Sequence, residues 1–295
     1  MIKDLNIPIE RDRLWMDENV VYEQVPGWCG HVTHNLRMSV IYHDVDFRHA
    51  NYPCVVWVTG GGWKWVDVQA YLPNLIDIAH AGYVLASVEY QCSNDAVFPE
   101  AIKQIKSAVR YLRANAERYR INPNYIGIMG ESSGGYLASM VGLTNENSFF
   151  ESGSFLNQSS SVQAVCSWYT PTMLEKLALE SGGSNMGLDQ NLGELLNRFL
   201  NVKVCENVEK AREADPLSHI KPPIPPFLLL HGTNDTLVPI ECTEKFYTAL
   251  QKAGAEVDYY RINGADHADY PFFQPKLMTL LSQFFDKYLI LTKEI

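Results

Sequence analysis

A serine enclosed by glycines carries the clearest chemical signal in this sequence. Residues 130–134 read Gly-Glu-Ser-Ser-Gly, which fits the pattern G-x-S-x-G with Ser132 at its centre. A short apolar run precedes the pattern and a helical pattern follows it, as in a nucleophile elbow. At such a turn the hydroxyl projects above a sheet, and the flanking glycines allow a close backbone approach that a Cβ would block. The pattern predicts a nucleophilic serine; the alternative is an ordinary Gly/Ser turn between a strand and a helix.

An aspartate and a histidine that could activate this serine follow it in the chain. Asp235 comes just after the apolar run 227–230, and His267 comes just after the β-rich run 257–262. Ser, Asp, His is the chain order of triads in α/β-hydrolases. We expect His267 to take the Ser132 proton and return it to the leaving group, and Asp235 to orient the imidazole and stabilise its cationic form.

Three titratable residues beside these positions have structural interpretations. Asp266 adjoins His267 and is an alternative acid, but neighbouring side chains in a loop rarely point together as a triad requires. His231 lies at the end of an apolar run and is predicted to be a hydrogen-bonded structural histidine. Glu131 adjoins the serine and is predicted to point away from the reaction.

Three consecutive glycines supply a further chemical feature. Residues 60–62 follow directly after the apolar run 54–58. Consecutive glycines are costly in conformational entropy, so an ordinary loop explains them poorly. Their N–H groups can form a nest that binds an oxyanion, as in the HGGG-type element of esterases. With Ser132 downstream, we interpret the segment as an oxyanion-binding loop.

The elements that must position these residues alternate between apolar strands and amphipathic helices. Strands are predicted over 54–58, 83–90, 125–129, 162–168, 227–230 and 257–262, and helices over 71–81, 99–116, 241–252 and 275–289. This order is typical of an α/β fold with a mostly parallel, doubly wound sheet. β-rich stretches at 20–22 and 36–42 predict an antiparallel hairpin at its N-terminal edge. Residues that follow parallel strands share one edge of the sheet, where they can converge.

The helix over 99–116 has a clear amphipathic pattern. Its apolar residues are spaced three and four apart, at positions 102, 105, 109, 112 and 116. Lys103, Lys106, Arg110 and Arg113 lie on the opposite face. The pattern predicts that the apolar face packs on the sheet and that the basic face is solvated.

Residues 171–225 break the alternation of strands and helices. They combine helical pieces at 173–179 and 192–200 with the Ser/Gly segment 181–184, and they end in a proline-rich segment. The stretch is too short for a good core of its own. We therefore expect one α/β-hydrolase domain over 1–295, with the 171–225 insertion as a small cap over the carboxyl edge of the sheet, where ligands of α/β proteins bind.

Composition excludes several classes of protein. The 295 residues are 46% apolar and 20% charged, with a net charge of −10, which argues against a nucleic-acid partner. No run has membrane-spanning length and the N-terminus lacks the apolar core of a signal peptide, so we expect a cytoplasmic protein, or a secreted one if a leader was trimmed. The histidines and cysteines lack the spacing of a metal site, so we expect no metal and no cofactor.

These residues carry a resemblance to a known superfamily. The sequence resembles the α/β-hydrolases on their hormone-sensitive-lipase-like side, and is similar to the carboxylesterases that include bifunctional feruloyl and acetyl xylan esterases. The resemblance covers most of residues 50–290 and rests on 60–63, 98–99, 130–135, 215–216, 231–235, 238–239 and His267. It implies an oxyanion hole made by the N–H groups of Gly61, Gly62 and Ser133. Two departures concern loop anchoring: Thr59 stands where histidine is frequent, and Gln91 where arginine is common.

The sequence therefore predicts a serine carboxylesterase that hydrolyses acyl esters through an acyl-enzyme. The expected partner is a small-molecule or carbohydrate-linked ester, such as an acetyl or feruloyl ester of plant polysaccharide, with no nucleic acid and no membrane; the sequence does not indicate an oligomeric state. Candidate substrate contacts at the active edge are Trp63, Trp65, Trp168, Tyr169 and Met173. Core packing is the alternative for each of these aromatic residues.

Two other functions remain open at this stage. An arylformamidase or other amidase could use the same triad. A non-catalytic ligand-binding protein on a hydrolase fold is the third hypothesis. The intact set Ser132, Asp235 and His267 counts against it, because a binding protein need not keep them.

Overall fold

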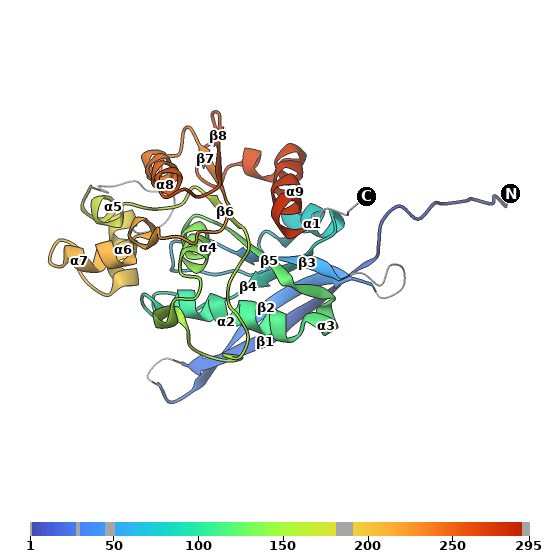
Figure 1. Ribbon diagram of the computed structural model, residues 1–295, viewed down its shortest axis with the longest axis horizontal. Coiled ribbons are helices and arrows are strands. Elements are labelled where there is room, and N and C mark those ends of the chain that lie inside the picture. The colour runs from blue at the N-terminus through green and yellow to red at the C-terminus, as the bar shows by residue number, and fades with distance from the viewer. Residues whose placement is uncertain (1, 28–29, 45–50, 181–190, 291–295) are drawn as a thin grey trace.

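An eight-stranded sheet forms the centre of the structure, a computed structural model that describes residues 2–27, 30–44, 51–180 and 191–290 (Figure 1). The strands are β1 (Leu14–Pro26), β2 (Thr33–His43), β3 (Tyr52–Val58), β4 (Val84–Val88), β5 (Ile121–Glu131), β6 (Val165–Trp168), β7 (Phe227–Gly232) and β8 (Val257–Ile262), in the spatial order β1-β2-β4-β3-β5-β6-β7-β8. The β1–β2 and β2–β4 pairs are antiparallel and the other pairs are parallel. The predicted fold class, with its antiparallel N-terminal edge, is confirmed.

Helices cover both faces of the sheet and make a three-layer structure. The α-helices are α1 (Leu72–His80), α2 (Glu100–Ala114), α3 (Ala116–Tyr119), α4 (Ser133–Leu143), α5 (Leu174–Glu180), α6 (Leu192–Leu200), α7 (Val208–Ala214), α8 (Glu241–Lys252) and α9 (Pro275–Leu289). Buried residues of α2, α4 and α8 pack on one face, and those of α1 and α9 pack on the other. None of the helices in the described ranges combines the length and apolarity of a membrane span.

The basic face of α2 departs from the sequence pattern. Lys106 and Arg110 were predicted to be solvated, and this is wrong, because both are completely buried. The chain that follows α4 passes over this side of α2 and brings Glu151 into ion pairs with both, at 2.6 Å from Lys106 Nζ. Burial lowers the pKa of both basic groups, and the pairing with Glu151 opposes that shift. The helical period correctly identified the basic face of α2, but the segment around Glu151, later in the chain, covers that face and buries it.

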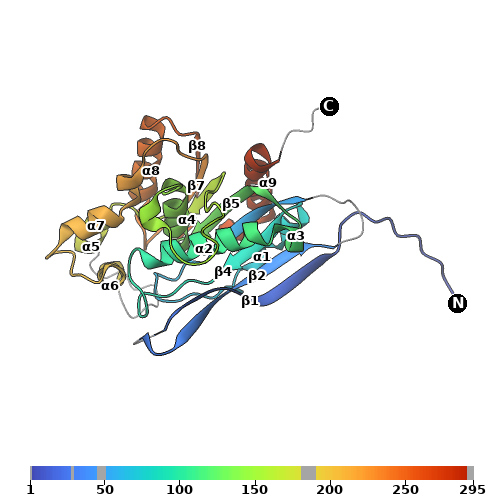
Figure 2. The same ribbon diagram turned by 60° about the horizontal axis from the view of Figure 1, so that its bottom comes forward.

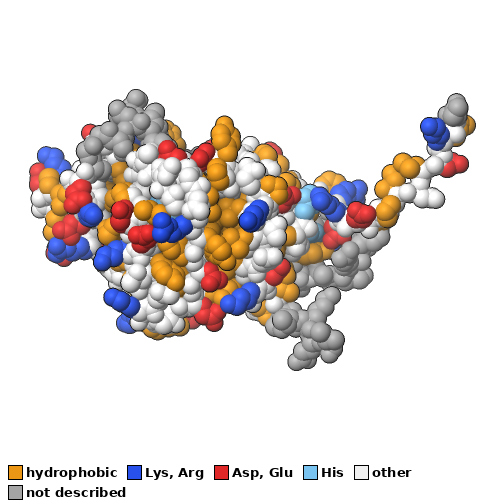
Figure 3. Space-filling model, turned by 90° about the horizontal axis from the view of Figure 1, so that it is seen from above, with side chains coloured by type: hydrophobic (Ala, Val, Ile, Leu, Met, Phe, Trp, Pro, Cys, Tyr) orange, Lys and Arg blue, Asp and Glu red, His pale blue; other side chains and the backbone are white. Residues whose placement is uncertain are grey.

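The N-terminal region extends beyond the compact body. β1 and β2 form a long ribbon at one edge of the sheet (Figure 2). Before β1, residues 2–10 project from the body as an arm that carries apolar and charged side chains (Figure 3). All of these residues are exposed.

The predicted insertion lies between β6 and β7. Of residues 171–225, the structure describes α5, α6, α7 and a short 3₁₀ helix, η3 (Pro216–His219), whereas the Ser/Gly segment 181–184 lies outside the described residues. These helices gather beside the carboxyl ends of the parallel strands (Figure 1). The insertion is therefore placed where it can contribute walls to a site at that edge.

Candidate active site

Ser132 lies on a strained turn between β5 and α4. Its backbone has φ +55° and ψ −125°, a conformation rarely adopted by a residue with a side chain and one that clusters at functional sites. A Cβ on Gly130 would lie 2.5 Å from the carbonyl oxygen of Gly134, so the turn requires glycine there. The Ser132 N–H donates to Trp168 O at 3.0 Å, which ties the turn to the neighbouring strand β6.

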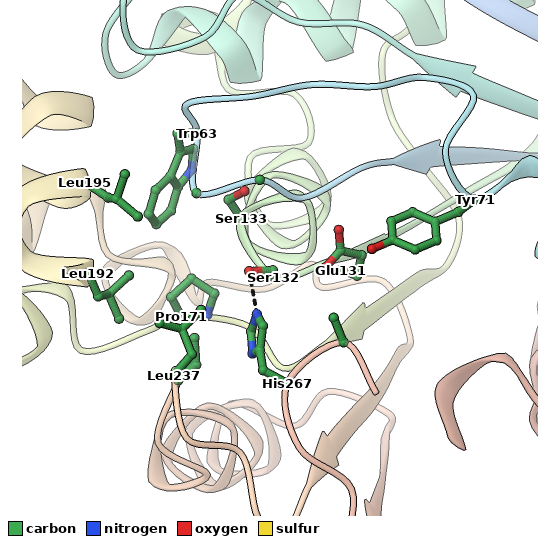
Figure 4. Close-up of a pocket in the computed structure, with 14 residues that line it drawn as sticks. Trp63, Tyr71, Glu131, Ser132, Ser133, Pro171, Leu192, Leu195, Leu237 and His267 are labelled. Carbon is green, nitrogen blue, oxygen red and sulfur yellow. Dashed lines mark hydrogen bonds between the residues drawn. The ribbon is translucent and has the colours of Figure 1, made fainter. Parts of the chain in front are cut away.

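The structure brings Ser132, His267 and Asp235 together at the carboxyl edge of the sheet. His267 Nε2 lies 2.9 Å from Ser132 Oγ (Figure 4), and His267 Nδ1 lies 2.8 Å from Asp235 Oδ2. The three residues follow β5, β8 and β7, so a parallel sheet converts a separation of more than 100 residues into direct contact. All three side chains are largely buried, with Ser132 9% and His267 8% exposed.

Asp235 is held as a carboxylate by four donors. Its Oδ1 accepts the N–H groups of Leu237 at 2.9 Å and Val238 at 2.8 Å. Its Oδ2 contacts His267 and also His231 Nε2, at 3.2 Å. Desolvation raises the pKa of Asp235, but the interactions with His231 and His267 outweigh it and hold this pKa well below its usual range.

His231 contacts the Asp235 carboxylate and is itself held by two further polar contacts. This completely buried side chain lies with Nε2 2.9 Å from Val238 O and Nδ1 2.7 Å from Thr243 Oγ1. A carbonyl oxygen only accepts, so Nε2 carries a proton, and in the neutral ring Nδ1 accepts from the threonine hydroxyl. The sequence predicted a hydrogen-bonded histidine here. The contact with Asp235 is a tertiary feature that the sequence did not indicate.

Asp266 has different partners from a triad acid. Its Oδ1 accepts the N–H of Thr236 at 2.8 Å and the backbone N–H of His267 at 2.7 Å. Partial desolvation raises the pKa of Asp266, but these hydrogen bonds outweigh it and lower the pKa. The carboxylate thus holds the backbone of the histidine loop, while the imidazole itself contacts Asp235.

Glu131 fixes the glycine loop beside the serine. The sequence predicted that Glu131 points away from the reaction; the structure instead places it in the wall of the site, with Oε1 accepting the Gly60 N–H at 2.6 Å. Burial raises the pKa of this carboxyl group. Gly61 and Gly62 adopt φ values of +126° and +60°, and both face the cavity with Ser133. Within the described residues, no backbone acceptor takes the N–H of either glycine.

The two departures from the family pattern have local replacements. Thr59 Oγ1 accepts from Trp57 Nε1 at 3.1 Å, and Thr59 O accepts from the Tyr90 hydroxyl at 2.9 Å. Gln91 and Gln104 bond reciprocally, at 2.8 Å and 2.6 Å. The Thr59 and Gln91 positions therefore make their own local hydrogen bonds in place of those of a histidine and an arginine.

A cavity of about 170 Å³ opens beside Ser132 (Figure 4). Pro171 precedes α5, Leu192 and Leu195 come from α6, and Leu237 and Val238 follow Asp235. None of these apolar residues was predicted from the sequence, and neither was Tyr71, which also lines the cavity. Leu237 and Val238 could have been predicted to line the site, because they follow Asp235 closely in the sequence. Nothing in the sequence showed which face of α6 would meet the serine.

The predicted substrate contacts lie in different environments in the structure. Trp63 lines the cavity, but it is 1% exposed and stacks on Phe199 with ring centroids 4.7 Å apart. Trp65 lies outside the cavity, half-exposed, with Lys64 Nζ 4.2 Å from its ring centroid. Met173 lines a separate depression between α5 and α7.

Trp168 and Tyr169 belong to the core instead, because β6 ends beneath the site. Both are completely buried. The ring centroids of Tyr169 and His267 lie 4.4 Å apart, so the tyrosine packs against the imidazole. Core packing, the alternative for these two aromatic residues, is what the structure shows. Within the described ranges, no group of three His, Cys, Asp or Glu side chains is arranged to hold a metal ion.

Fold and site together define an α/β-hydrolase. The model of the BD-FAE family matches residues 41–250, and the chain belongs to this family. It is similar to the esterase LipQ of Mycobacterium tuberculosis, with 29% identity over 224 residues that cover 73% of this chain and 50% of LipQ. Esterase LipC of the same organism is 26% identical over 83% of this chain and 63% of its own length. The chain thus spans about half to two thirds of the length of these curated relatives.

Solved structures share the fold over nearly the whole chain. A bifunctional GH43-CE protein of Bacteroides eggerthii superposes with a TM-score of 0.78 at 26% identity, covering 92% of this chain and 38% of that one. A truncated carbohydrate esterase from gut microbiota gives 0.77 at 23% identity, covering 95% and 98% of the two chains. At 23% identity, the similarity to the truncated carbohydrate esterase supports only a shared fold.

Proposed function

We propose that this protein is a serine carboxylesterase that cleaves short-chain acyl esters through an acyl-enzyme. The observation that carries the proposal is the hydrogen-bonded chain from Ser132 through His267 to Asp235, at the mouth of a cavity. In this proposal Ser132 Oγ attacks the ester carbon while His267 Nε2 takes its proton. Asp235 stabilises the resulting imidazolium, and its lowered pKa keeps it ionised while it does so.

The glycine loop stabilises the negative charge that develops on the carbonyl oxygen. Gly61 and Gly62 line the cavity, and Ser133 opens helix α4, whose N-terminal end favours an anion. The tetrahedral intermediate then collapses. The bond to the alcohol breaks, and His267 gives its proton to the departing oxygen. Water repeats the sequence on the acyl-enzyme and releases the acid.

The cavity supports a short acyl group such as acetyl. Its volume of about 170 Å³ lies below the roughly 300 Å³ at which drug-sized ligand pockets begin. Leu192, Leu195 and Leu237 close its far side. A feruloyl group is long and flat, so we propose that acetyl-type esters are the better substrates.

The test is a comparison of rates on four substrates. p-Nitrophenyl acetate, acetylated xylan, methyl ferulate and N-formylkynurenine should be assayed side by side. We expect hydrolysis of the two acetyl esters, with a burst of p-nitrophenol equal to the enzyme concentration if deacylation is slow. Turnover of N-formylkynurenine alone would support an amidase instead. Absence of turnover on every substrate would contradict the proposal.

A further inference from the structure

A second depression borders the catalytic histidine on the side away from the leucines. It has a volume of about 580 Å³ and shares His267 and Ala268 with the acyl cavity. Its other walls include Asn74 of α1, and Asp269, Tyr270, Phe273 and Gln274 around the short 3₁₀ helix η4 (Tyr270–Phe273). We call this depression the η4 groove. None of the roles proposed above uses it.

The geometry of the reaction directs the alcohol part of the ester toward this side. The tetrahedral carbon has four substituents: Ser132 Oγ, the oxyanion, the acyl chain and the departing oxygen. The oxyanion faces the glycine loop and the acyl chain enters the leucine-lined cavity. The departing oxygen must lie within hydrogen-bond reach of His267 Nε2, which protonates it.

Figure 4 shows the leucines of α6 and Tyr71 on opposite sides of Ser132. The Tyr71 ring stacks on Phe273, with centroids 5.0 Å apart and an interplanar angle of 10°. Tyr71 lines the acyl cavity and Phe273 lines the η4 groove, so this stacked pair lies between the two, which adjoin at His267 and Ala268. An alcohol that leaves past His267, away from the leucines, enters the η4 groove.

The groove has the side chains that recognise a neutral polyhydroxylated ligand. Tyr270 is 84% exposed, and Asp269 holds it in place by accepting its N–H at 2.7 Å. Gln274 donates its amide to Tyr270 O at 3.0 Å, which leaves its carbonyl oxygen to accept. Among the described residues, the Asn74 side chain has no hydrogen-bond partner, and no lysine or arginine lines the groove. The two amides and the carboxylates of Asp266 and Asp269 suit hydroxyl groups, and an exposed ring suits the apolar face of a sugar. An anionic alcohol would find no cation among the described residues of the groove.

We propose that the η4 groove is the leaving-group subsite and that it binds the sugar unit which carries the ester. This inference rests on the esterase function proposed above. The alcohol side of the site is larger and more polar than the acyl side, so recognition of the substrate lies mainly in the alcohol. Cleavage forms the Ser132 acyl bond, breaks the bond to the sugar oxygen and transfers the proton from His267 to that oxygen.

The experiment uses esters that share the acetyl group and differ in the alcohol. Monoacetylated methyl xyloside presents a sugar, whereas ethyl acetate presents an alcohol too small to reach Tyr270. For Tyr270→Ala and for Gln274→Ala we expect kcat/KM on the xyloside to fall about tenfold, and kcat/KM on ethyl acetate to stay within about twofold. Tyr260→Ala is the matched control, because Tyr260 is an exposed tyrosine of β8 outside the groove.

A second measurement separates binding of the alcohol from support of His267. The acetyl-enzyme formed from p-nitrophenyl acetate can be captured by methyl xyloside or by water. By microscopic reversibility, Tyr270→Ala should reduce transfer to the xyloside and leave hydrolysis by water unchanged. Equal losses with sugar, ethyl and water acceptors would overturn the inference in favour of a structural role for η4, and undiminished xyloside kinetics would place the alcohol elsewhere. In both cases Ser132-dependent hydrolysis of p-nitrophenyl acetate would leave the esterase proposal intact.

Discussion

The sheet edge and the inserted helices meet at one cavity, yet they are built in different ways. At the sheet edge, Ser132, Asp235 and His267 follow paired strands and are joined by hydrogen bonds of 2.8 and 2.9 Å. In the insertion, Leu192 and Leu195 reach the cavity from α6, a helix held mainly by apolar packing. The reacting groups are thus fixed by backbone hydrogen bonding. The acyl wall is fixed mainly by side-chain packing, which tolerates changes of volume.

This difference predicts two kinds of variant. Changes at the sheet edge should lower the rate for every ester, because all esters present the same carbonyl. Changes in the insertion should redistribute rates among esters, because only the rest of the substrate touches it. The following experiments test this division, beginning with the largest expected effect.

The largest effect is expected from Ser132→Ala. Loss of the nucleophile should lower kcat by about 10³- to 10⁶-fold on every ester, since the covalent route disappears. The fold should survive, and thermal unfolding is the control. If the variant kept most of its activity, Ser132 would not be the nucleophile.

The two candidate acids should behave very differently. Asp235→Asn should lower kcat about 10⁴-fold, because an asparagine at this position of a triad holds the imidazole in the wrong tautomer. Asp266→Asn should have a much smaller effect, because Asp266 binds backbone N–H groups rather than the ring. Steady-state kinetics on p-nitrophenyl acetate measures both. Large and comparable losses in two folded variants would contradict the assignment.

His231 should act as a positioning residue through Asp235. We expect His231→Ala to lower kcat by up to about 10²-fold, because a small displacement of a catalytic group has that order of effect. KM should change little. His231→Gln should recover part of the loss, since its amide can donate near the position of Nε2. A variant whose kcat is unchanged, or a loss that Gln does not relieve, would leave His231 with a structural role only.

The pH dependence should reflect the requirement for a neutral base. The imidazole must be neutral to accept a proton, so kcat/KM should fall as acidification protonates it. Because the pKa of Asp235 is lowered in the fold, its carboxylate stabilises the native state above the unfolded-state pKa, and that contribution is lost only as the pH falls through the folded pKa. Asp235 therefore adds no second step between pH 5 and 8. A rate that decreases as the pH rises through this range would contradict a histidine base.

The smallest effects are expected in the insertion, as changes of preference. Leu195→Ala should enlarge the acyl cavity and raise the ratio of kcat/KM for butyrate over acetate p-nitrophenyl esters by about tenfold, since one methylene in an apolar pocket has that order of effect. Activity on acetate should change little. Trp65→Ala is the control outside the cavity, and its ratio should stay within about twofold. A uniform loss on both esters would show that Leu195 supports the catalytic residues rather than selecting the acyl group.

The sequence predicts an element best where local chemistry leaves few choices. The predicted helices over 241–252 and 275–289 match α8 and α9, because the hydrophobic period that determines them is a local property of the chain. Contacts between segments that are distant in the sequence are harder to predict. Glu131 stands beside the serine in sequence, but its role depends on the N–H of Gly60, which comes from another strand. The burial of Lys106 and Arg110 likewise depends on Glu151, 41 to 45 residues further on.

The sequence by itself identified the candidate reacting groups and the strands that carry them. A nucleophile elbow needs glycine at particular positions, and an alternation of buried strands and amphipathic helices allows few topologies. Only the tertiary structure decided which side chains surround those groups: the leucines of α6 at the acyl cavity, His231 behind Asp235, and Tyr270 at the η4 groove. The physical reason is that backbone patterns are set by neighbours in the chain, whereas the walls of a site are set by packing between segments that the sequence keeps far apart.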